Sequence, residues 1–288
     1  MAAIYCPTPS SELHAMTGRS RAVEVEKNRA DLRETVCDKV AIEEPLEIRL
    51  GFDALGKRDT RSLSITMRTP GDDEELATGF LFGEGRLRSR GDVAVVKPCR
   101  GDNTVRVELD DDVSVDLDRL ARHFYTSSSC GVCGKASLEA LHVQGCAPLA
   151  GELRIGRDDL IDLPNRLRDV QTTFDETGGL HAAAAFDSTG QLVVVREDVG
   201  RHNAVDKVVG ALFSEGRLPA GDLGLVVSGR ASFELVQKAL VAGMPMLAAV
   251  GAPSSLAVEL AQEFNVTLVG FLRGESFNVY ASKERIAG

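Results

Sequence analysis

The sequence lacks the features that mark several protein classes. It has no Trp, only 5% aromatic residues and only 6 Cys in 288 residues, too few cysteines for a small disulfide-stapled scaffold. No window approaches about 18 consecutive apolar residues, so we expect no membrane span. The first residues contain no basic stretch that leads into an apolar run, so we expect no secretory signal. These absences together favour a reduced, cytoplasmic protein.

The composition that is present indicates a folded chain. Hydrophobic residues make up 43% and charged residues 26%, which excludes a disordered protein. Acidic residues outnumber basic ones by 43 to 33, and the net charge of −10 argues against general binding to nucleic acid backbones. The length allows one large domain or two modest ones.

The first half of the chain is divided into two parts by its pattern. Residues 1–36 are polar and mixed, and we expect a poorly ordered tail there, with a short helix near Val23 to Arg33. Residues 37–150 predict an α+β region that ends in a Cys-x-x-Cys loop. Period-two alternation predicts strands in this region, and helical spacing after a Thr69-Pro-Gly-Asp stop and cap predicts one helix at residues 74–83. The expected strands cover residues 39–50, 61–69, 92–97 and 103–109.

Residues 151–288 alternate between helical and strand patterns, which predicts a layered α/β core. The strand segments are short and almost continuously apolar, as buried parallel strands are. They cover residues 191–196, 223–228, 246–250 and 266–271. The expected helices cover residues 164–174, 179–186, 202–213, 232–241 and 254–264.

Cys130 and Cys133 form the one closely spaced cysteine pair, just before a helix expected near Lys135. A helix N-terminus and a nearby Lys lower the pKa of a thiol and favour the reactive thiolate. The spacing alone leaves several interpretations open. The pair fits a redox site, a reactive thiol that carries a transferred group, a structural pair, or a zinc site completed by His123, His142 or Cys146.

Three polar clusters lie where helices and strands meet in the second half. They are the segments 177–184, 196–207 and 228–234. Ligands of open α/β sheets bind beyond the carboxyl ends of strands, where helix N-termini offer N–H groups to anions. The clusters could therefore surround one phosphate-bearing ligand, although caps and turns explain the pattern equally well. The candidate counter-charges are Arg196, Arg201, Lys207 and Arg230.

His181 and the last hairpin carry weaker signals. A helix-borne His-Ala is similar to the His-x-Glu of zinc deaminases, but position 183 is Ala and no Cys follows Cys146, so a working deaminase site is excluded. A polar ligand contact or a satisfied buried His remains. In segment 270–280, Arg273 could pair with a phosphate and Glu275 could accept hydrogen bonds from a guanine-like edge. A plain hairpin fits the same spacing.

Four motifs in this order resemble one family. They are Cys130-Gly-Val-Cys133-Gly-Lys135, Thr177-Gly-Gly-Leu-His-Ala-Ala-Ala, Arg196-Glu-Asp-Val-Gly-Arg-His-Asn-Ala-Val-Asp-Lys and Ser228-Gly-Arg-Ala-Ser. Over residues 37–285 the chain resembles the formate dehydrogenase accessory sulfurtransferases, also called formate dehydrogenase D proteins. The combination is highly specific, although each motif alone is not.

The resemblance implies a function and a set of site residues. Such proteins take persulfide sulfur from a cysteine desulfurase and pass it to the molybdenum or tungsten bis(molybdopterin guanine dinucleotide) cofactor that formate dehydrogenase requires. By motif, Cys130 would carry the persulfide, with Cys133 as its partner. The resemblance places the cofactor, or GDP-like nucleotides, on Phe271, Leu272, Arg273, Gly274, Glu275 and Ser276, and His181, Arg201, Ser228 and Arg230 are further candidates.

The resemblance also implies a cytidine-deaminase-like core without the zinc site, no resident metal, and a homodimer. Two other classes of function stay open. One is a non-catalytic chaperone that binds the cofactor and docks formate dehydrogenase. The other is a zinc-bound structural adaptor that uses the Cys-x-x-Cys.

Overall fold

The computed structural model describes residues 18–30, 32–54, 56–99, 103–113 and 145–288, which form a mixed α/β fold. The strands of these residues are β1 (Ser20–Arg29), β2 (Leu32–Ala41), β3 (Glu44–Ala54), β4 (Lys57–Arg68), β5 (Val93–Cys99), β6 (Thr104–Leu109), β7 (Ile155–Gly156), β8 (His181–Phe186), β9 (Leu192–Asp198), β10 (Gly224–Val227), β11 (Met246–Ala249), β12 (Thr267–Arg273), β13 (Ser276–Ala281) and β14 (Ile286–Ala287). The helices are α1 (Asp73–Gly83), α4 (Arg157–Asp169), α5 (Thr172–Thr177), α6 (Arg201–Ser214), α7 (Phe233–Val241) and α8 (Ser255–Glu263).

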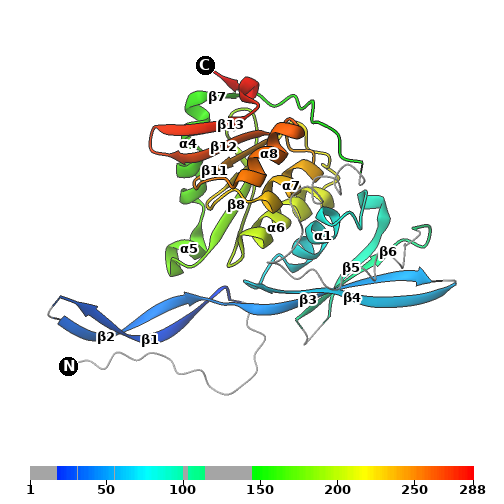
Figure 1. Ribbon diagram of the computed structural model, residues 1–288. Coiled ribbons are helices and arrows are strands. Elements are labelled where there is room, and N and C mark those ends of the chain that lie inside the picture. Colours follow the sequence, from blue (N-terminus) through cyan, green and yellow to red (C-terminus); the bar gives the residue numbers. More distant parts are fainter. Residues whose placement is uncertain (1–17, 31, 55, 100–102, 114–144) are drawn as a thin grey trace.

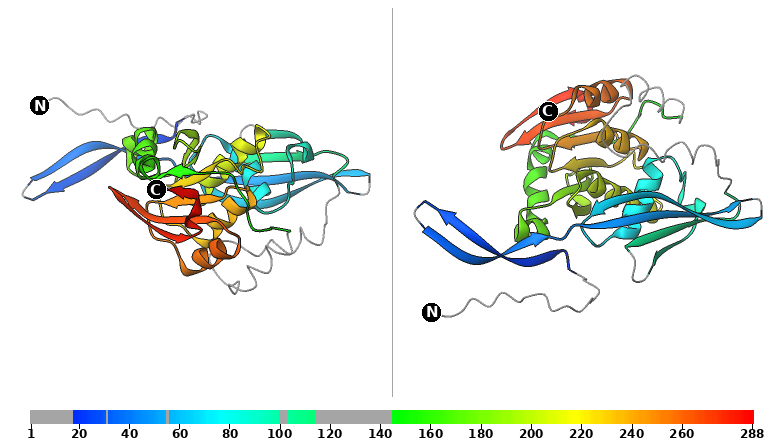
Figure 2. Two further views of the ribbon diagram at one scale, coloured as in Figure 1. Left: turned by 90° about the horizontal axis from the view of Figure 1, so that it is seen from above. Right: turned by 60° about the horizontal axis from the view of Figure 1, so that its bottom comes forward.

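Strands β1 and β2 form a long antiparallel hairpin, here called the arm, which projects from the rest of the molecule (Figures 1 and 2). The expectation of a poorly ordered tail with a short helix is therefore wrong for residues 18–36. On β1, Val23 and Val25 alternate with Glu24 and Glu26, and Val25 lies directly opposite Val36 of β2. This is strand periodicity, which the high charge content obscured. Residues 1–17 lie outside the described part.

A four-stranded sheet of order β4-β3-β6-β5 follows the arm and confirms the α+β expectation. Its inner face packs on α1, mainly through β5 and β6. The buried side chains of β3 belong to the same apolar cluster, with Leu46, Ile48 and Phe52 at most 1% exposed. The predicted side-chain cap of α1 is wrong. Asp72 adopts a left-handed conformation with φ 57° and makes no capping hydrogen bond, because its carboxylate pairs with Arg19 instead.

The second sheet has the order β13-β12-β11-β10-β8-β9. Strands β10, β11 and β12 are parallel as predicted, whereas β13, β8 and β9 run antiparallel to their neighbours. The helix expected at residues 179–186 is wrong, since His181–Phe186 is strand β8. Alanine favours helices locally, but here four small alanines fit inside a sheet that is covered on both faces. The helix expected at residues 164–174 is split into α4 and α5.

The larger sheet forms the middle of three layers (Figure 1). Helix α4 covers one face, and α6, α7 and α8 cover the other. The helices α1 and α6 touch backbone to backbone, because a Cβ on Gly79 or Gly210 would lie within 2 Å of the opposite helix's carbonyl oxygen, at 1.8 and 1.9 Å. One cluster of buried apolar side chains runs through both sheets. The deaminase-like layering stays a prediction. None of the described helices is long and apolar enough to cross a membrane.

Candidate functional site

The loops after β10, β11 and β12 lie side by side at the carboxyl ends of these parallel strands. The amide of Gly251 donates to the carbonyl of Gly229 at 2.9 Å, and the amide of Phe271 donates to the carbonyl of Gly251 at 3.0 Å. We call this part of the molecule the strand-end edge: residues 228–232, 250–253 and 270–276, with the neighbouring residues 181 and 200–202. In open α/β sheets this is where ligands bind.

The backbone at this edge is closely packed and locally strained. A Cβ on Gly251 would lie 3.0 Å from the carbonyl oxygen of Gly229, and one on Gly270 would lie 2.9 Å from Pro253. Phe271 has φ 52°, a left-handed conformation that costs about 1–3 kcal/mol for a residue with a side chain. Such residues cluster at functional sites, so the strain supports a ligand-binding role for this edge.

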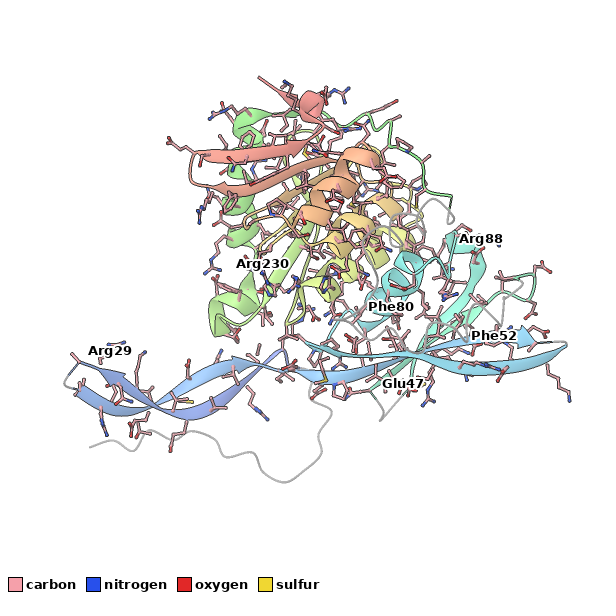
Figure 3. The ribbon with its side chains drawn as sticks, in the orientation of Figure 1. Arg29, Glu47, Phe52, Phe80, Arg88 and Arg230 are labelled. Carbon is pink, nitrogen blue, oxygen red and sulfur yellow. The ribbon has the colours of Figure 1, made fainter. Side chains whose placement is uncertain are left out.

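The antiparallel neighbours of β10 bring further polar residues to the same edge. Strand β8 begins at His181, which pairs in register with Asp198 at the end of β9. Ser228 accepts a hydrogen bond on its Oγ from the amide of Ala182 at 2.9 Å. Figure 3 labels Arg230 on this side of the molecule. The structure therefore brings four predicted residues together at one edge: His181, Arg201, Ser228 and Arg230.

Arg201 and Arg230 are the cations that this edge leaves available. Among the described residues, neither has a carboxylate within ion-pair distance, and the Nε of Arg201 is buried without a hydrogen-bond partner. Arg201 is the first residue of α6, and α7 begins nearby at Phe233. Two unpaired guanidinium groups beside two helix N-termini make a local anion-attracting surface on a chain whose net charge is −10.

Two histidines flank Arg201 and stay neutral at pH 7. Burial lowers the pKa of His181, the Arg201 charge lowers it further, and Asp198 partly offsets both. Burial and then Arg201 lower the pKa of His202 to about 4. Its Nε2 lies 3.3 Å from Ser232 Oγ and 3.8 Å from a carboxylate oxygen of Glu234. The sequence places His202 in the polar segment 196–207 without singling it out, and its position directly after Arg201 at a helix start is the signal that could have done so.

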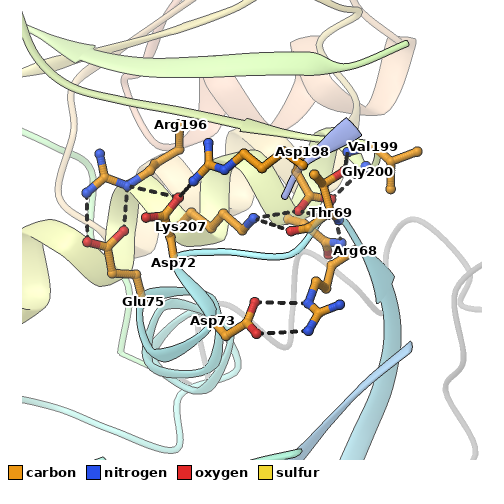
Figure 4. Close-up of polar contacts among 12 residues, drawn as sticks. Arg68, Thr69, Asp72, Asp73, Glu75, Arg196, Asp198, Val199, Gly200 and Lys207 are labelled. Carbon is orange, nitrogen blue, oxygen red and sulfur yellow. Dashed lines mark hydrogen bonds and ion pairs between the residues drawn. The ribbon is translucent and has the colours of Figure 1, made fainter. Parts of the chain in front are cut away.

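Arg196 and Lys207 do not serve a ligand, so their expected role as counter-charges is wrong. The Lys207 ammonium lies 2.8 Å from the Asp198 carboxylate, and both side chains are 0% exposed. The guanidinium of Arg196 makes two hydrogen bonds to Glu75, at 2.5 and 2.7 Å. Figure 4 shows these pairs together at the start of α1.

These pairs belong to a set of contacts that we call the clasp: Thr69, Glu75, Arg196, Asp198 and Lys207. Lys207 donates to the carbonyl of Thr69 at 3.0 Å, and the amide of Thr69 donates to Asp198 at 3.2 Å. The amide of Gly200 also donates to Asp198, at 2.9 Å. The clasp thus ties the connection between β4 and α1 to the end of β9 in the larger sheet (Figure 4), and Gly200 joins it to the strand-end edge.

Two further charges near the clasp are structural. The carboxylate of Glu197 accepts hydrogen bonds from the amides of Thr173 and Phe174 at 3.0 and 2.9 Å, so it caps the start of α5. Asp206 is buried under α1 and pairs with Lys238 at 2.6 Å. Burial raises the pKa of Asp206 to about 6, although Lys238 opposes this shift.

The remaining predicted residues lie at the turn between β12 and β13, where one is buried and the others are exposed or half-buried. Leu272 is 0% exposed and belongs to the core, so only its backbone could meet a ligand. Arg273, Gly274, Glu275 and Ser276 are exposed. The Arg273 guanidinium lies over the Phe271 ring, 5.6 Å from its centroid. The carbonyl of Glu275 accepts a hydrogen bond from Arg157 at 3.3 Å. The exposed part of this turn therefore offers one stacked cation and one carboxylate.

Cys130 and Cys133 lie outside the described residues, as do His123 and His142 of the zinc alternative. Among the described residues, no group of three or more His, Cys, Asp or Glu is placed to hold a metal ion. Cys146 is half-buried against the core, and burial raises the pKa of its thiol. A few residues later, the amide of Leu149 donates a hydrogen bond to the carbonyl of Phe264, just after the end of α8, at 2.9 Å.

Comparison with known proteins gives a consistent result. Residues 41–287 match the sequence model of the FdhD/NarQ family. The "Sulfur carrier protein FdhD" of Streptomyces coelicolor is 52% identical over 260 residues, covering 87% of this chain and 89% of that protein. The protein of the same name from Mycolicibacterium paratuberculosis is 49% identical over 281 residues, which cover 94% of this chain and 99% of that protein. The crystal structure of a proposed formate dehydrogenase accessory protein from Desulfotalea psychrophila superposes with a TM-score of 0.74 at 26% identity. The superposition covers 94% of this chain and 100% of that protein.

Proposed function

The chain belongs to the FdhD/NarQ family, and on this premise we propose that it carries sulfur for the maturation of formate dehydrogenase. The observation that carries the proposal is the strand-end edge itself. Two arginines without acidic partners among the described residues, two helix N-termini and a strained turn meet there on a chain of net charge −10. An acidic protein that gathers unpaired cations at one edge is suited to bind a polyanionic ligand.

The ligand in this proposal is the bis(molybdopterin guanine dinucleotide) cofactor of molybdenum or tungsten, bound as a substrate. Arg201 and Arg230 would hold its phosphates, because guanidinium groups bind phosphate oxygens in pairs of hydrogen bonds. The exposed carboxylate of Glu275 would accept hydrogen bonds from a guanine edge. The rest of the turn, from Phe271 to Ser276, would enclose the nucleotide. GDP-like nucleotides would occupy the same place.

The sulfur in this proposal travels on Cys130. Its thiolate attacks the terminal sulfur of a cysteine desulfurase persulfide, the bond between the two desulfurase sulfurs breaks, and the desulfurase cysteine leaves as a thiolate. Cys130 then holds the persulfide. When the outer sulfur passes to the bound cofactor, the bond between the two sulfurs breaks, Cys130 is regenerated as a thiolate, and the metal of the substrate cofactor would supply the two electrons that reduce the transferred sulfur. Cys133 would relay sulfur or support the loop. A cytoplasmic homodimer with a deaminase-like, zinc-free core completes the proposal.

Peptide mass spectrometry tests the sulfur-carrying step. The full chain is incubated with a cysteine desulfurase, its pyridoxal cofactor and cysteine. We expect one added sulfur on the peptide that contains Cys130, and we expect Cys130→Ala to lose both this sulfur and the activation of formate dehydrogenase. Cys37→Ala, which changes an exposed cysteine on the arm, is the matched control and should behave as the parent protein.

The activity of Cys130→Ala and the zinc content of the purified protein separate the two alternative functions. Activation of formate dehydrogenase by Cys130→Ala would contradict sulfur transfer and favour a chaperone that only binds the cofactor. Stoichiometric zinc in the purified protein, lost on substitution of Cys130 and Cys133, would favour the structural adaptor.

A further inference from the structure

We propose that ligand binding at the strand-end edge is linked to proton uptake, and that two neighbouring histidines, His181 and His202, accept the protons. The proposal rests on the proposed function for the class of ligand, a phosphate-bearing nucleotide. It adds a residue, His202, to the site and gives the site a dependence on pH.

The two histidines come from different elements, and both lie close enough to Arg201 to feel its charge. His181 opens β8, and its Nδ1 lies 3.4 Å from the place a Cβ on Gly229 would take, so the ring faces the first loop of the edge. His202 follows Arg201 in the first turn of α6, and 37% of its side chain is exposed. A phosphate bound by Arg201 would therefore come close to both rings.

The charges around these rings favour the neutral form when no anion is present. His202 faces Arg201, Lys238 and His181, against one carboxylate, Glu234. His181 faces Arg201 and Asp198. Asp198 is already paired with Lys207 at 2.8 Å, so its charge is largely compensated. The net surroundings are positive, and this lowers the pKa of both rings beyond the effect of burial.

An anionic ligand reverses this balance. A phosphate beside Arg201 cancels the repulsion that this cation exerts on both imidazoles, so the pKa of each rises on binding. His202 also has a partner ready for the extra proton. In the protonated ring Nε2 can only donate, and both Ser232 Oγ at 3.3 Å and Glu234 at 3.8 Å can accept. By linkage, a ligand that raises these pKa values binds more tightly as the pH falls.

Calorimetry with a ligand of constant charge tests the proposal. The probe is diguanosine diphosphate, two guanosines joined 5′ to 5′. Each of its phosphates carries one ester and one anhydride bond and keeps a single strongly acidic oxygen, so neither titrates near neutral pH. Binding to the full chain is measured from about pH 7.5 down to about pH 5.5, in buffers of different ionisation enthalpy. We expect net proton uptake and a dissociation constant about threefold to tenfold lower at the acidic end, since one fully coupled proton gives about tenfold per pH unit.

Variants separate this inference from the proposed function. The double variant His181→Gln with His202→Gln should lose the proton uptake and flatten the pH profile, whatever its affinity at neutral pH. Arg217→Gln, three residues beyond the C-terminal end of α6, is the control and should keep the slope of the parent protein. Binding without proton uptake, or an unchanged slope in the double variant, would overturn the inference alone. No binding of the probe at any pH would contradict the nucleotide site, and the inference with it.

Discussion

The clasp and the strand-end edge contain charged residues from the same short segment of the chain, and they use them in opposite ways. Asp198 and Lys207 are wholly buried and paired. Arg201, between them in sequence, has no acidic partner among the described residues. The difference follows from helix geometry, because Arg201 begins α6 at the edge while Lys207 lies more than one turn further, under the β4–α1 connection. A dense run of charges therefore does not by itself identify ligand contacts.

The two regions should also differ in what substitutions do. A buried ion pair is held by its partner and by hydrogen bonds, so losing one member leaves an uncompensated charge in the core. A cation without an acidic partner adds no ion pair to the folded state and is free to bind a ligand. Substitutions in the clasp should act on stability, and substitutions at the edge should act on binding.

The largest expected effect comes from Asp198→Asn. This change leaves Lys207 charged and buried without its counter-ion, and we expect the free energy of unfolding to fall by about 3–5 kcal/mol. Urea denaturation of the purified variant measures it. Asp175→Asn is the matched control, because Asp175 pairs with Arg168 at the surface, where both side chains are at least half exposed at 55% and 50%. A loss below about 1 kcal/mol for Asp198→Asn, the range of a surface pair, would contradict the clasp.

The next effect contrasts two arginines that are five positions apart in the sequence. Arg201→Gln should weaken binding of diguanosine diphosphate about tenfold or more, the value of one charged hydrogen bond, without lowering the unfolding midpoint. Arg196→Gln should lower the unfolding midpoint and leave the affinity for the probe unchanged, because the Arg196 guanidinium is bound to the Glu75 carboxylate. Calorimetry and urea denaturation of both variants give the comparison. Equal loss of affinity in the two variants would remove the distinction between the regions.

The smallest effect concerns pH. Burial raises the pKa of Asp206 to about 6 from an ordinary 3.8, so the folded protein holds this proton more tightly than the unfolded chain does. Stability from this group is therefore present at about pH 5 and is lost as the pH rises through 6, a change of about 1 kcal/mol. The edge histidines act in the other direction, since their lowered pKa values favour unfolding in acid.

Asp206→Asn isolates that contribution. We expect the difference in unfolding free energy between about pH 5 and pH 7 to shift by about 1 kcal/mol relative to the parent protein, toward lower stability in acid. The slope is the readout, because the substitution also leaves Lys238 without its partner. An identical slope in both proteins would show that Asp206 does not titrate in this range.

The sequence predicts the parts of the fold whose periodicity and packing agree. Helices α1, α6, α7 and α8 and the parallel strands β10–β12 match their expected positions within a few residues. Strand β8 was missed because an alanine run favours a helix locally, and only the pairing with β9 and β10 overrides that preference. The arm was missed because charged residues hide its alternation.

The site was predicted in part for a related reason. Polar clusters that follow strands indicate where ligands meet an α/β sheet, and His181, Arg201, Ser228 and Arg230 do lie at one edge. The partners of buried charges come from distant parts of the chain. Glu75 lies 121 positions from Arg196, and Thr69 lies 138 positions from Lys207. Local patterns cannot reveal such partners, so the clasp could not be distinguished from the ligand contacts.

The arm has a mechanical consequence. The arm meets the body mainly at its base, where Ser20 and Lys39 both contact Glu176 of α5. Changes in the hairpin beyond this base would therefore leave the clasp and the strand-end edge undisturbed. The arm is attached to the body at one end, so a force on its tip reaches the body through these contacts at the base.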